Sequence, residues 1–249
     1  MNSAWSLQGS TALVTGAGGG IGRAIAIALA CSGCKVIITG RRREVLDELA
    51  HEIGPAAHPL LLEMTDAEAI ARLPAELPEG FRGPTVLVNN AAEDVGGRTR
   101  FDESSAEQLS RVIETNLLGV IRMTRALVPA MLQRSQGDIV NIGSTNAMRT
   151  TQNMAAYTAS KTGLHGLTDV LRADYAKSGI RVIEIVPGLT KTGFAKARMN
   201  GNEEMARAYF DKFPTALDPQ EIADSVIYAL SRPRHVCVQQ MVVTPSFQW

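Results

Sequence analysis

Short, mostly apolar runs recur along the chain and alternate with longer stretches in which apolar and polar residues mix at helical spacing. Strands that are apolar throughout are typical of a parallel sheet covered on both faces. The runs predict seven strands at 11–15, 35–39, 58–62, 85–89, 138–142, 181–186 and 240–244, and the stretches between them predict helices at 21–32, 43–53, 66–75, 105–134, 153–178 and 219–231.

This alternation of strand and helix indicates βαβ units with right-handed crossovers. No linker, low-complexity segment or solenoid repeat divides the chain. We therefore expect one doubly wound α/β domain over residues 1–249, of the Rossmann type, with a seven-stranded parallel sheet flanked by helices.

The composition of the chain limits which binding partners are expected, but it says little about the reaction. The 249 residues are 45% apolar and carry 25 basic and 25 acidic side chains. A balanced charge gives no reason to expect nucleic acid or an acidic membrane surface as a partner. The start of the chain lacks the pattern of a signal peptide, and no apolar run approaches the roughly 20 residues that span a bilayer. We expect a soluble, cytoplasmic protein without a membrane partner.

The cysteines do not predict a disulfide framework or a metal site. Cys31 and Cys34 have a CxxC spacing, but no second pair and no nearby histidine completes a zinc set. We expect instead that Cys31 ends a helix, Gly33 makes a turn and Cys34 starts a strand, and we expect no bound metal.

A glycine cluster follows the first predicted strand directly, with the sequence TGAGGGIG at 15–22. Glycines permit a tight turn and let backbone N–H groups approach a pyrophosphate, and the following helix N-terminus adds partial positive charge. Because the cluster lies between the first strand and the first helix, it predicts a dinucleotide site. The residues expected to contact the cofactor are Gly16, Gly18, Gly20, Ile21 and Gly22.

The end of the second strand bears on the choice of cofactor. An NAD site usually has an acidic residue there, whereas this chain has Gly40 followed by Arg41, Arg42 and Arg43. Guanidinium groups suit a 2′-phosphate. The alternative, that the arginines only solvate a helix start, is weakened because positive charge is unfavourable at that end. We predict NADP, with NAD left possible.

The candidate catalytic residues begin with Tyr157 and Lys161, four residues apart and on one face of a predicted helix. A neighbouring ammonium group is expected to lower the pKa of a tyrosine from near ~10. Such a pair also occurs on ordinary helix surfaces. Ser144, after the fifth strand, and Asn116, an unfavourable choice within a long helix, strengthen the catalytic interpretation.

Together these motifs resemble the short-chain dehydrogenase/reductase family over essentially the whole chain. The matching segments are TGAGGGIG (15–22), NNA (89–91), Asn116, Ser144, YTASK (157–161) and PGLTKT (187–192). Three segments resemble the subgroup of bacterial NADP-dependent 3-hydroxy acid (serine) dehydrogenases and sulfoacetaldehyde reductases: VIITGRR, VNIGST and the C-terminal segment.

The resemblance implies a role for each catalytic residue. Tyr157 would be the general acid in reduction and the general base in oxidation, and Ser144 would stabilise charge on the substrate oxygen. Lys161 would hold the nicotinamide ribose and tune Tyr157. Asn116 would hold a water molecule for proton relay. The substrate would be an alcohol or carbonyl compound, with a lean towards a small 3-hydroxy acid.

The resemblance also implies further cofactor contacts. These involve Glu63, Asn89, Ala91, Tyr157, Lys161, Pro187, Gly188 and Thr192, with Ile142 beneath the nicotinamide. The chain departs from the family where Glu63 stands in place of an aspartate and where Ala92, instead of glycine, follows NNA. It also ends without the family's TGQ turn.

The charged residues near the expected substrate site do not decide whether the substrate is an anion. In the segments 93–100 and 145–154 and in an expected lid at about 190–213, Arg149 and Arg198 would attract a carboxylate or sulfonate, whereas Glu93 and Asp94 would repel it. The lid contains apolar residues at helical spacing, and it is equally typical of an ordinary surface helix.

Other functions on the same fold are a broad-range or NAD-dependent carbonyl reductase, a non-catalytic cofactor-binding sensor and a sugar-nucleotide epimerase. The retained tyrosine and lysine disfavour a sensor, and the chain length disfavours an epimerase. The family resemblance also implies a homotetramer packed through the long helices at 105–134 and 153–178.

Overall fold

The computed structural model describes residues 6–95, 99–194, 198–199 and 201–248. Its parallel sheet has seven strands in the order β3-β2-β1-β4-β5-β6-β7, which confirms the expected doubly wound fold. The strands are β1 Thr11–Val14, β2 Lys35–Gly40, β3 Ala57–Leu61, β4 Val86–Asn89, β5 Gly137–Ile142, β6 Ile180–Pro187 and β7 Gln240–Val243. Every strand end lies within one residue of its predicted position.

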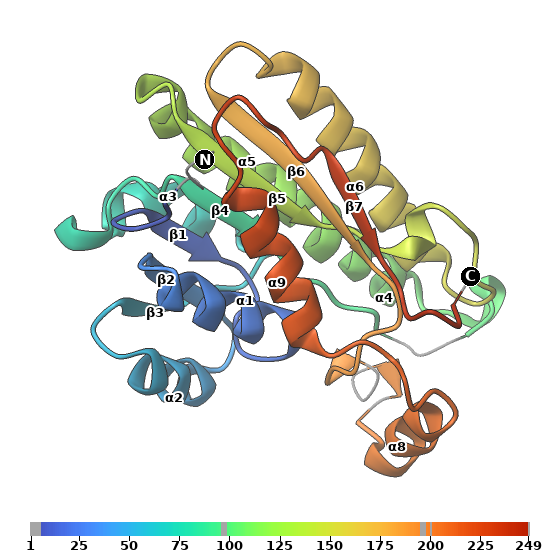
Figure 1. The fold of residues 1–249 in the computed structure, drawn as a ribbon. Helices are drawn as coiled ribbons and strands as arrows, with labels where there is room; N and C mark the ends of the chain where they lie inside the picture. The colour runs from blue at the N-terminus through green and yellow to red at the C-terminus, as the bar shows by residue number, and fades with distance from the viewer. Residues whose placement is uncertain (1–5, 96–98, 195–197, 200, 249) are drawn as a thin grey trace.

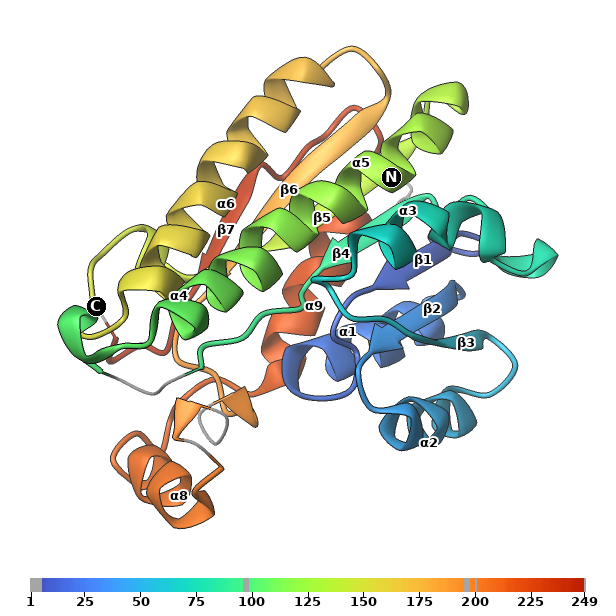
Figure 2. The same ribbon diagram turned by 180° about the vertical axis from the view of Figure 1, so that it is seen from behind.

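Helices cover both faces of the sheet, as Figures 1 and 2 show from opposite sides. One layer consists of α1 (Gly20–Cys31), α2 (Arg43–Ile53) and α9 (Pro219–Leu230), and the other of α3 (Ala67–Glu76), α4 (Ala106–Ile113), α5 (Gly119–Gln133) and α6 (Ala155–Asp174). Each layer buries its own apolar cluster against the strands. The short helix α8 (Glu203–Asp211) projects beyond the sheet edge (Figure 1).

The predicted helix at 105–134 is not continuous. A π-helical turn, η3 (Glu114–Leu118), separates α4 from α5, and it contains the fully buried Asn116. Wide turns of this kind often occur at functional sites because they displace backbone carbonyls from the α-helical ladder. The predicted helix at 153–178 is also shorter, since α6 ends at Asp174.

A buried ion cluster joins strands at the amino end of the sheet. Asp138 of β5 accepts a hydrogen bond from Arg181 of β6 at 2.6 Å and from Arg234 at 2.8 Å. Arg181 also donates to the backbone carbonyl of Leu230, at the end of α9. Both oxygens of the Asp138 carboxylate are therefore bonded, and the cluster ties the last helix to the central strands.

The CxxC segment has the expected local structure. Cys31 is the last residue of α1, Gly33 has a φ of 86°, and Cys34 directly precedes β2. Both thiols are free, and burial raises the pKa of Cys34 to about 11. Within the described part of the chain, no helix is both long enough and apolar enough to cross a membrane.

Candidate functional site

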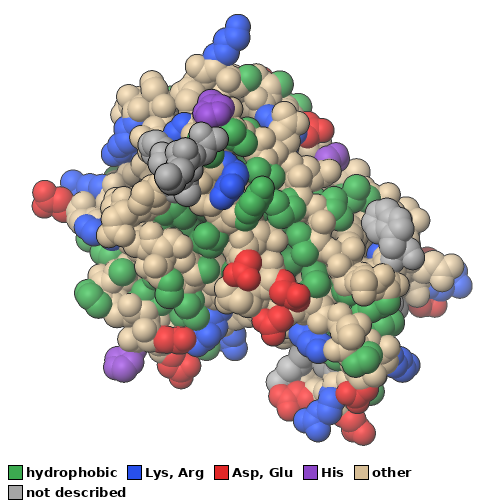
Figure 3. Space-filling view, in the orientation of Figure 1, with side chains coloured by type: hydrophobic (Ala, Val, Ile, Leu, Met, Phe, Trp, Pro, Cys, Tyr) green, Lys and Arg blue, Asp and Glu red, His purple; other side chains and the backbone are tan. Residues whose placement is uncertain are grey.

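A cavity of about 1030 Å³ lies at the carboxyl ends of the strands, where doubly wound sheets bind ligands. Figure 3 shows the surface hollowed between the body of the molecule and the projecting lobe that contains α8. Most of the predicted site residues line this cavity: Gly16, Gly18, Gly20, Ile21, Arg41, Arg42, Glu63, Ala91, Ser144, Tyr157, Lys161, Pro187, Gly188 and Thr192. Gly22, Asn89 and Asn116 lie outside its lining.

The turn between β1 and α1 requires glycine for two separate reasons. Gly16 has a φ of 65°, and a Cβ atom there would lie 2.8 Å from the Cα atom of Ala91. A Cβ atom on Gly22 would collide with the backbone carbonyl of Gly16. The turn therefore packs closely on the end of β4, and the N-terminus of α1, which has no acidic residue in its first turn, faces the cavity. This arrangement fits a pyrophosphate.

Asn90, which directly follows β4, holds this turn in place, and the sequence interpretation missed it. Its side-chain amide donates to the backbone carbonyls of Thr15 at 2.9 Å and Gly16 at 3.1 Å. The hydroxyl of Thr15 in turn accepts from the backbone amides of Asn90 and Ala91, both at 3.0 Å. The NNA motif contained the signal, because its second asparagine lies directly after β4.

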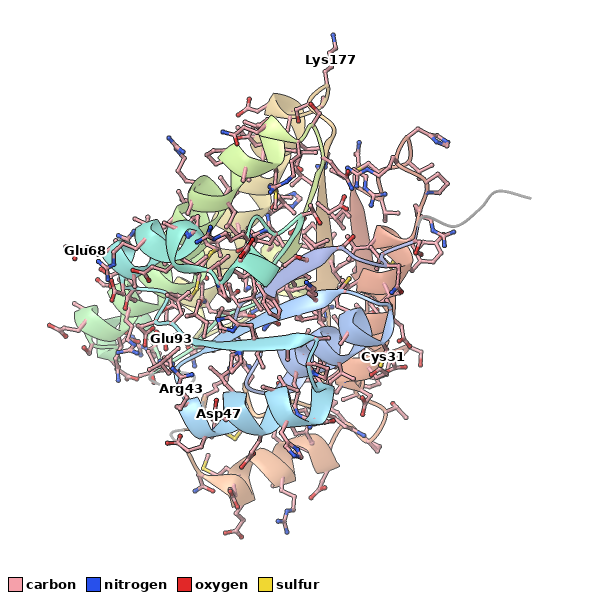
Figure 4. All side chains as sticks on the ribbon, turned by 90° about the vertical axis from the view of Figure 1, so that its left-hand side faces the viewer. Cys31, Arg43, Asp47, Glu68, Glu93 and Lys177 are labelled. Atoms are coloured by element: carbon pink, nitrogen blue, oxygen red, sulfur yellow. The ribbon has the colours of Figure 1, made fainter. Side chains whose placement is uncertain are left out.

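The arginines after β2 divide into two groups. Arg41 and Arg42 line the cavity, whereas Arg43 does not. The Nη1 atom of Arg41 lies 3.2 Å from Glu93 and 3.7 Å from Glu63, and its side chain is 54% exposed. Figure 4 shows Glu93 close to the start of α2, which Arg43 marks. With only one nitrogen of its fork engaged, Arg41 retains donors for a phosphate group.

Asn89 belongs to a buried polar row instead of the cavity wall. In register across neighbouring strands, Asn89 of β4 pairs with Asn141 of β5, Asn141 with Glu184 of β6, and Glu184 with Gln240 of β7. Asn89 donates to Asn141 at 2.8 Å, and Asn141 donates to Thr168 of α6 at 2.8 Å. The cofactor contact expected of Asn89 therefore stays a prediction, and its amide nitrogen is engaged inside the sheet layer.

The side chain of Asn116 is fully engaged by the loop after β4. Its Oδ1 atom accepts from the backbone N–H of Glu93 at 2.8 Å, and its Nδ2 atom donates to the Glu93 carbonyl at 2.9 Å and to Ser160 at 3.2 Å. The amide thus links the π-helical turn η3 to this loop and to α6. A water molecule would have to bind the Asn116 backbone carbonyl instead of its side chain.

Tyr157 and Lys161 lie on one face of α6, next to the end of β5. The Nζ atom of Lys161 donates to the backbone carbonyl of Ile142 at 2.8 Å and lies 5.9 Å from the centre of the Tyr157 ring. Burial lowers the pKa of Lys161 from 10.5 to about 8, and the charge of Glu184 opposes this shift.

The pKa of Tyr157 shifts in the direction opposite to the one expected from the sequence. Burial raises it, while a hydrogen bond with Ser144 and the charge of Arg198 partly offset the rise and Asp94 adds to it. The expectation of a lowered pKa is wrong because desolvation of the hydroxyl outweighs both the hydrogen bond with Ser144 and the charge of Arg198. Tyr157 is therefore held in its protonated form.

The acidic and basic side chains near the substrate region pair with one another instead of competing. The Nε atom of Arg198 donates to buried Asp94 at 2.6 Å, and its guanidinium carbon lies 5.7 Å from the Tyr157 ring centre. Buried Glu93 accepts from Arg111 at 2.8 Å and from Thr115 at 2.8 Å. The expected repulsion of an anion by Glu93 and Asp94 is thus largely neutralised. Arg149 also lines the cavity.

Aromatic residues from the expected lid form one wall of the cavity. Phe194 lies 5.6 Å from the Tyr157 ring, Tyr209 lies 5.4 Å from Phe213, and Phe213 stacks on Phe247 near the C-terminus at 5.6 Å. Met205, in contrast, points to solvent and is 56% exposed. Residues 195–197 and 200 of the lid range lie outside the described residues.

Comparisons with known proteins identify the family. Residues 10–203 match the family model described as short chain dehydrogenase. The NADP-dependent 3-hydroxy acid dehydrogenase of Schizosaccharomyces pombe is 32% identical over 97% of this chain and 95% of that protein. Sulfoacetaldehyde reductase 2 of Chromohalobacter salexigens is 34% identical over 95% of this chain and 94% of that protein.

A solved structure agrees with this result. The closed form of serine dehydrogenase complexed with NADP⁺ has a TM-score of 0.93 and 33% identity, and the match covers 96% of each chain. The chain therefore belongs to the short-chain dehydrogenase family and is an oxidoreductase.

Proposed function

We propose that this protein is an NADP(H)-dependent oxidoreductase that interconverts a secondary alcohol with a ketone, or a primary alcohol with an aldehyde, on a small polar substrate such as a 3-hydroxy acid. The observation that carries the proposal is the convergence of Ser144, Tyr157 and Lys161 on one cavity with the glycine turn and Arg41. The similar 3-hydroxy acid dehydrogenase of Schizosaccharomyces pombe is NADP-dependent, and the similar serine dehydrogenase structure is complexed with NADP⁺.

The cavity offers specific partners for each part of the cofactor. The turn at Gly16 and the N-terminus of α1 would bind the pyrophosphate, and Arg41 with Arg42 would bind the 2′-phosphate. Lys161 would bind the nicotinamide ribose. When bound, the nicotinamide supplies or accepts the hydride.

The residues of the chain itself handle the proton. In reduction, the hydroxyl of Tyr157 donates a proton to the substrate carbonyl oxygen as negative charge develops there, and Ser144 donates a hydrogen bond to the same oxygen. The raised pKa of Tyr157 suits this acid role because the hydroxyl carries its proton at neutral pH. In oxidation the same hydroxyl must lose its proton, and the positive charge of Lys161 stabilises the phenolate that results.

Lys161 and the π-helical turn η3 would exchange the proton of Tyr157 with solvent. Lys161 has three N–H donors and uses one on Ile142, so others can serve a water molecule. The backbone carbonyl of Asn116 would hold that water, since its side chain is engaged by Glu93 and Ser160.

Substrate size and polarity follow from the remaining cavity wall. The ion pair of Arg198 and Asp94 lies beside the Tyr157 ring, and the two terminal nitrogens of the Arg198 fork are not used by Asp94. Those nitrogens would bind the carboxylate or sulfonate of a small substrate, which agrees with the activities named for the relatives. Phe194 and the aromatic lid residues would exclude water.

The decisive experiment measures NADPH oxidation with a panel of aldehydes, ketones, 3-oxo acids and sulfonated aldehydes. We expect turnover with at least one anionic substrate and a loss of about 10²–10⁴-fold in Tyr157→Phe, the range for general acid catalysis. Retention of most activity in Tyr157→Phe would contradict the mechanism. NADPH binding without turnover of any panel member would favour a cofactor-binding sensor.

We also infer a cytoplasmic homotetramer that packs through α5 and α6. Large apolar side chains are exposed on these helices, with Ile121 at 39%, Leu132 at 41% and Val170 at 57%. Contact between subunits through α5 and α6 would bury these side chains. Sedimentation of the wild type against Ile121→Lys tests the assembly, and a monomeric wild type would contradict it.

A further inference from the structure

Glu184 is a buried carboxylate that the proposed mechanism does not use. It lies in strand β6, between β5 and β7, and has no exposed surface. Its Oε2 atom contacts His165 of α6 at 2.7 Å and accepts from Gln240 of β7 at 2.8 Å. Its Oε1 atom accepts no hydrogen bond from any described residue. A half-satisfied buried charge is costly, so a compensating interaction is required.

The unpartnered oxygen is directed at the backbone that holds the catalytic residues. A Cβ atom on Gly143 would lie 2.6 Å from Oε1, so the carboxylate packs directly against the backbone at Gly143. Gly143 connects Ile142, whose carbonyl binds Lys161, to Ser144. The carboxylate therefore lies beneath the loop on which the site is built.

The spacing along α6 places the lysine above the same carboxylate. Lys161 and His165 are four residues apart on this helix and share a face. His165 contacts Glu184 directly, and Lys161 is buried one helical turn closer to the cavity. Among the described residues, Glu184 is the charged group whose field favours the ammonium form of Lys161.

We propose that Glu184 is the buried counter-charge of Lys161, a positioning residue that keeps the lysine protonated at the pH at which the enzyme works. Burial alone drives Lys161 towards its neutral form, in which it can neither stabilise a phenolate on Tyr157 nor donate all three hydrogen bonds. A carboxylate across Gly143 opposes that loss. His165 and Gln240 hold the carboxylate in place.

The surrounding groups leave this assignment intact. Lys161 faces Tyr157 on its own helix, Ile142 on β5 and Glu184 on β6. Glu184 faces His165 on α6 and Gln240 on β7. Behind His165, the carboxylate of Asp169 lies 3.8 Å from Nε2 and pairs with Arg172 at 2.6 Å, so its charge is largely neutralised.

The test is to titrate Lys161 and to monitor the titration by NMR in protein labelled with ¹³C at its lysine side chains. The Lys161 signal is assigned as the one that is missing in Lys161→Arg. Glu184→Gln keeps the side-chain shape and removes the charge, and we expect the Lys161 midpoint to fall by about one pH unit or more. Asp138→Asn is the matched control, because it removes a buried carboxylate from the neighbouring strand at the opposite end of the sheet. It should leave the midpoint unchanged.

A second variant covers the case in which Glu184→Gln does not fold. Glu184→Asp keeps the charge and withdraws it by one methylene, so its Lys161 midpoint should lie between those of the wild type and Glu184→Gln. An unchanged midpoint in either folded Glu184 variant would overturn the proposal, and so would an equal shift in Asp138→Asn.

The inference rests on the proposed function in one respect, namely that Lys161 takes part in turnover. The titration is measured without substrate, so a normal Lys161 shift in an inactive protein would count against the proposed function alone. In the active enzyme, the pH at which reduction declines on the alkaline side should move down with the Lys161 midpoint in Glu184→Gln.

Discussion

Two buried carboxylates in neighbouring strands show how differently the two ends of one sheet are built. At the amino end, Asp138 has both oxygens bonded by Arg181 and Arg234. At the carboxyl end, Glu184 has one oxygen bonded by His165 and Gln240 and the other without a donor among the described residues. Both side chains are at least nine-tenths buried, so exposure does not distinguish them.

The difference separates a structural ion pair from a charge kept available for function. A carboxylate that is fully paired and hydrogen-bonded has little field left to act on other groups. A carboxylate that lacks donors on one oxygen imposes its charge on its surroundings, and buried Lys161 is close enough to feel it. Strain and unsatisfied polar groups concentrate where chemistry occurs.

The largest effect on stability should come from the amino end. Asp138→Asn leaves the buried guanidinium of Arg181 without its counter-charge, and the free energy of unfolding should fall by about 3 kcal/mol or more. Urea denaturation monitored by circular dichroism measures this change. Activity per folded molecule should be preserved. A stable Asp138→Asn variant with reduced turnover would contradict a structural role for the amino end of the sheet.

At the carboxyl end, the stability of the protein should depend on pH through Lys161. The pKa of Lys161 is lowered from 10.5 to about 8 by burial, so the unfolded chain binds its proton more tightly than the folded protein does. Between these two pKa values the unfolded state carries more protons, and stability therefore rises with pH across that window. Below about pH 8 the full cost of burying the ammonium is present.

Lys161→Met should remove this rise of about 1–3 kcal/mol between pH 8 and pH 10.5, because the group whose pKa differs between the folded and unfolded states is gone. It should also abolish turnover. Denaturation curves at several pH values compare the two proteins. A rise of equal size in Lys161→Met would show that another group causes it.

Cofactor selection at the end of β2 should respond more modestly. Arg41→Ala removes a guanidinium from the cavity wall, and NADP binding should weaken by about tenfold relative to NAD binding. Arg43→Ala is the matched control because Arg43 does not line the cavity and pairs only loosely, at 3.9 Å, with Asp47. Fluorescence titration with both nucleotides gives the ratio. Equal losses for NADP and NAD would remove Arg41 from the 2′-phosphate site.

The smallest effect concerns the polar row across β4, β5, β6 and β7. Thr168→Val keeps the side-chain shape and removes the hydroxyl that accepts from Asn141 at 2.8 Å and donates to Leu164 at 2.7 Å. A loss of about 1 kcal/mol in unfolding free energy is expected for a buried hydrogen bond of this kind. Thermal unfolding measures it, and a loss as large as that of Asp138→Asn would make the row a main source of stability.

Much of the architecture could be predicted from local sequence. Apolar runs that alternate with amphipathic stretches placed each strand end within one residue, because burial on both faces of a parallel sheet leaves a strong local pattern. The glycine turn at 15–22 and the spacing of Tyr157 and Lys161 are equally local features. The unfavourable placement of Asn116 was visible as well, although the π-helical turn that accommodates it was not.

Only the tertiary structure decided how distant charges and amides combine. Arg198 meets Asp94 across 104 positions, and Gln240 meets Glu184 across 56. No periodicity records such pairs, because they depend on sheet register and on which way each side chain turns. For the same reason the sequence could not reveal that burial of the hydroxyl raises the pKa of Tyr157. The sequence determined the fold and the catalytic candidates, whereas burial and register decided their charge states.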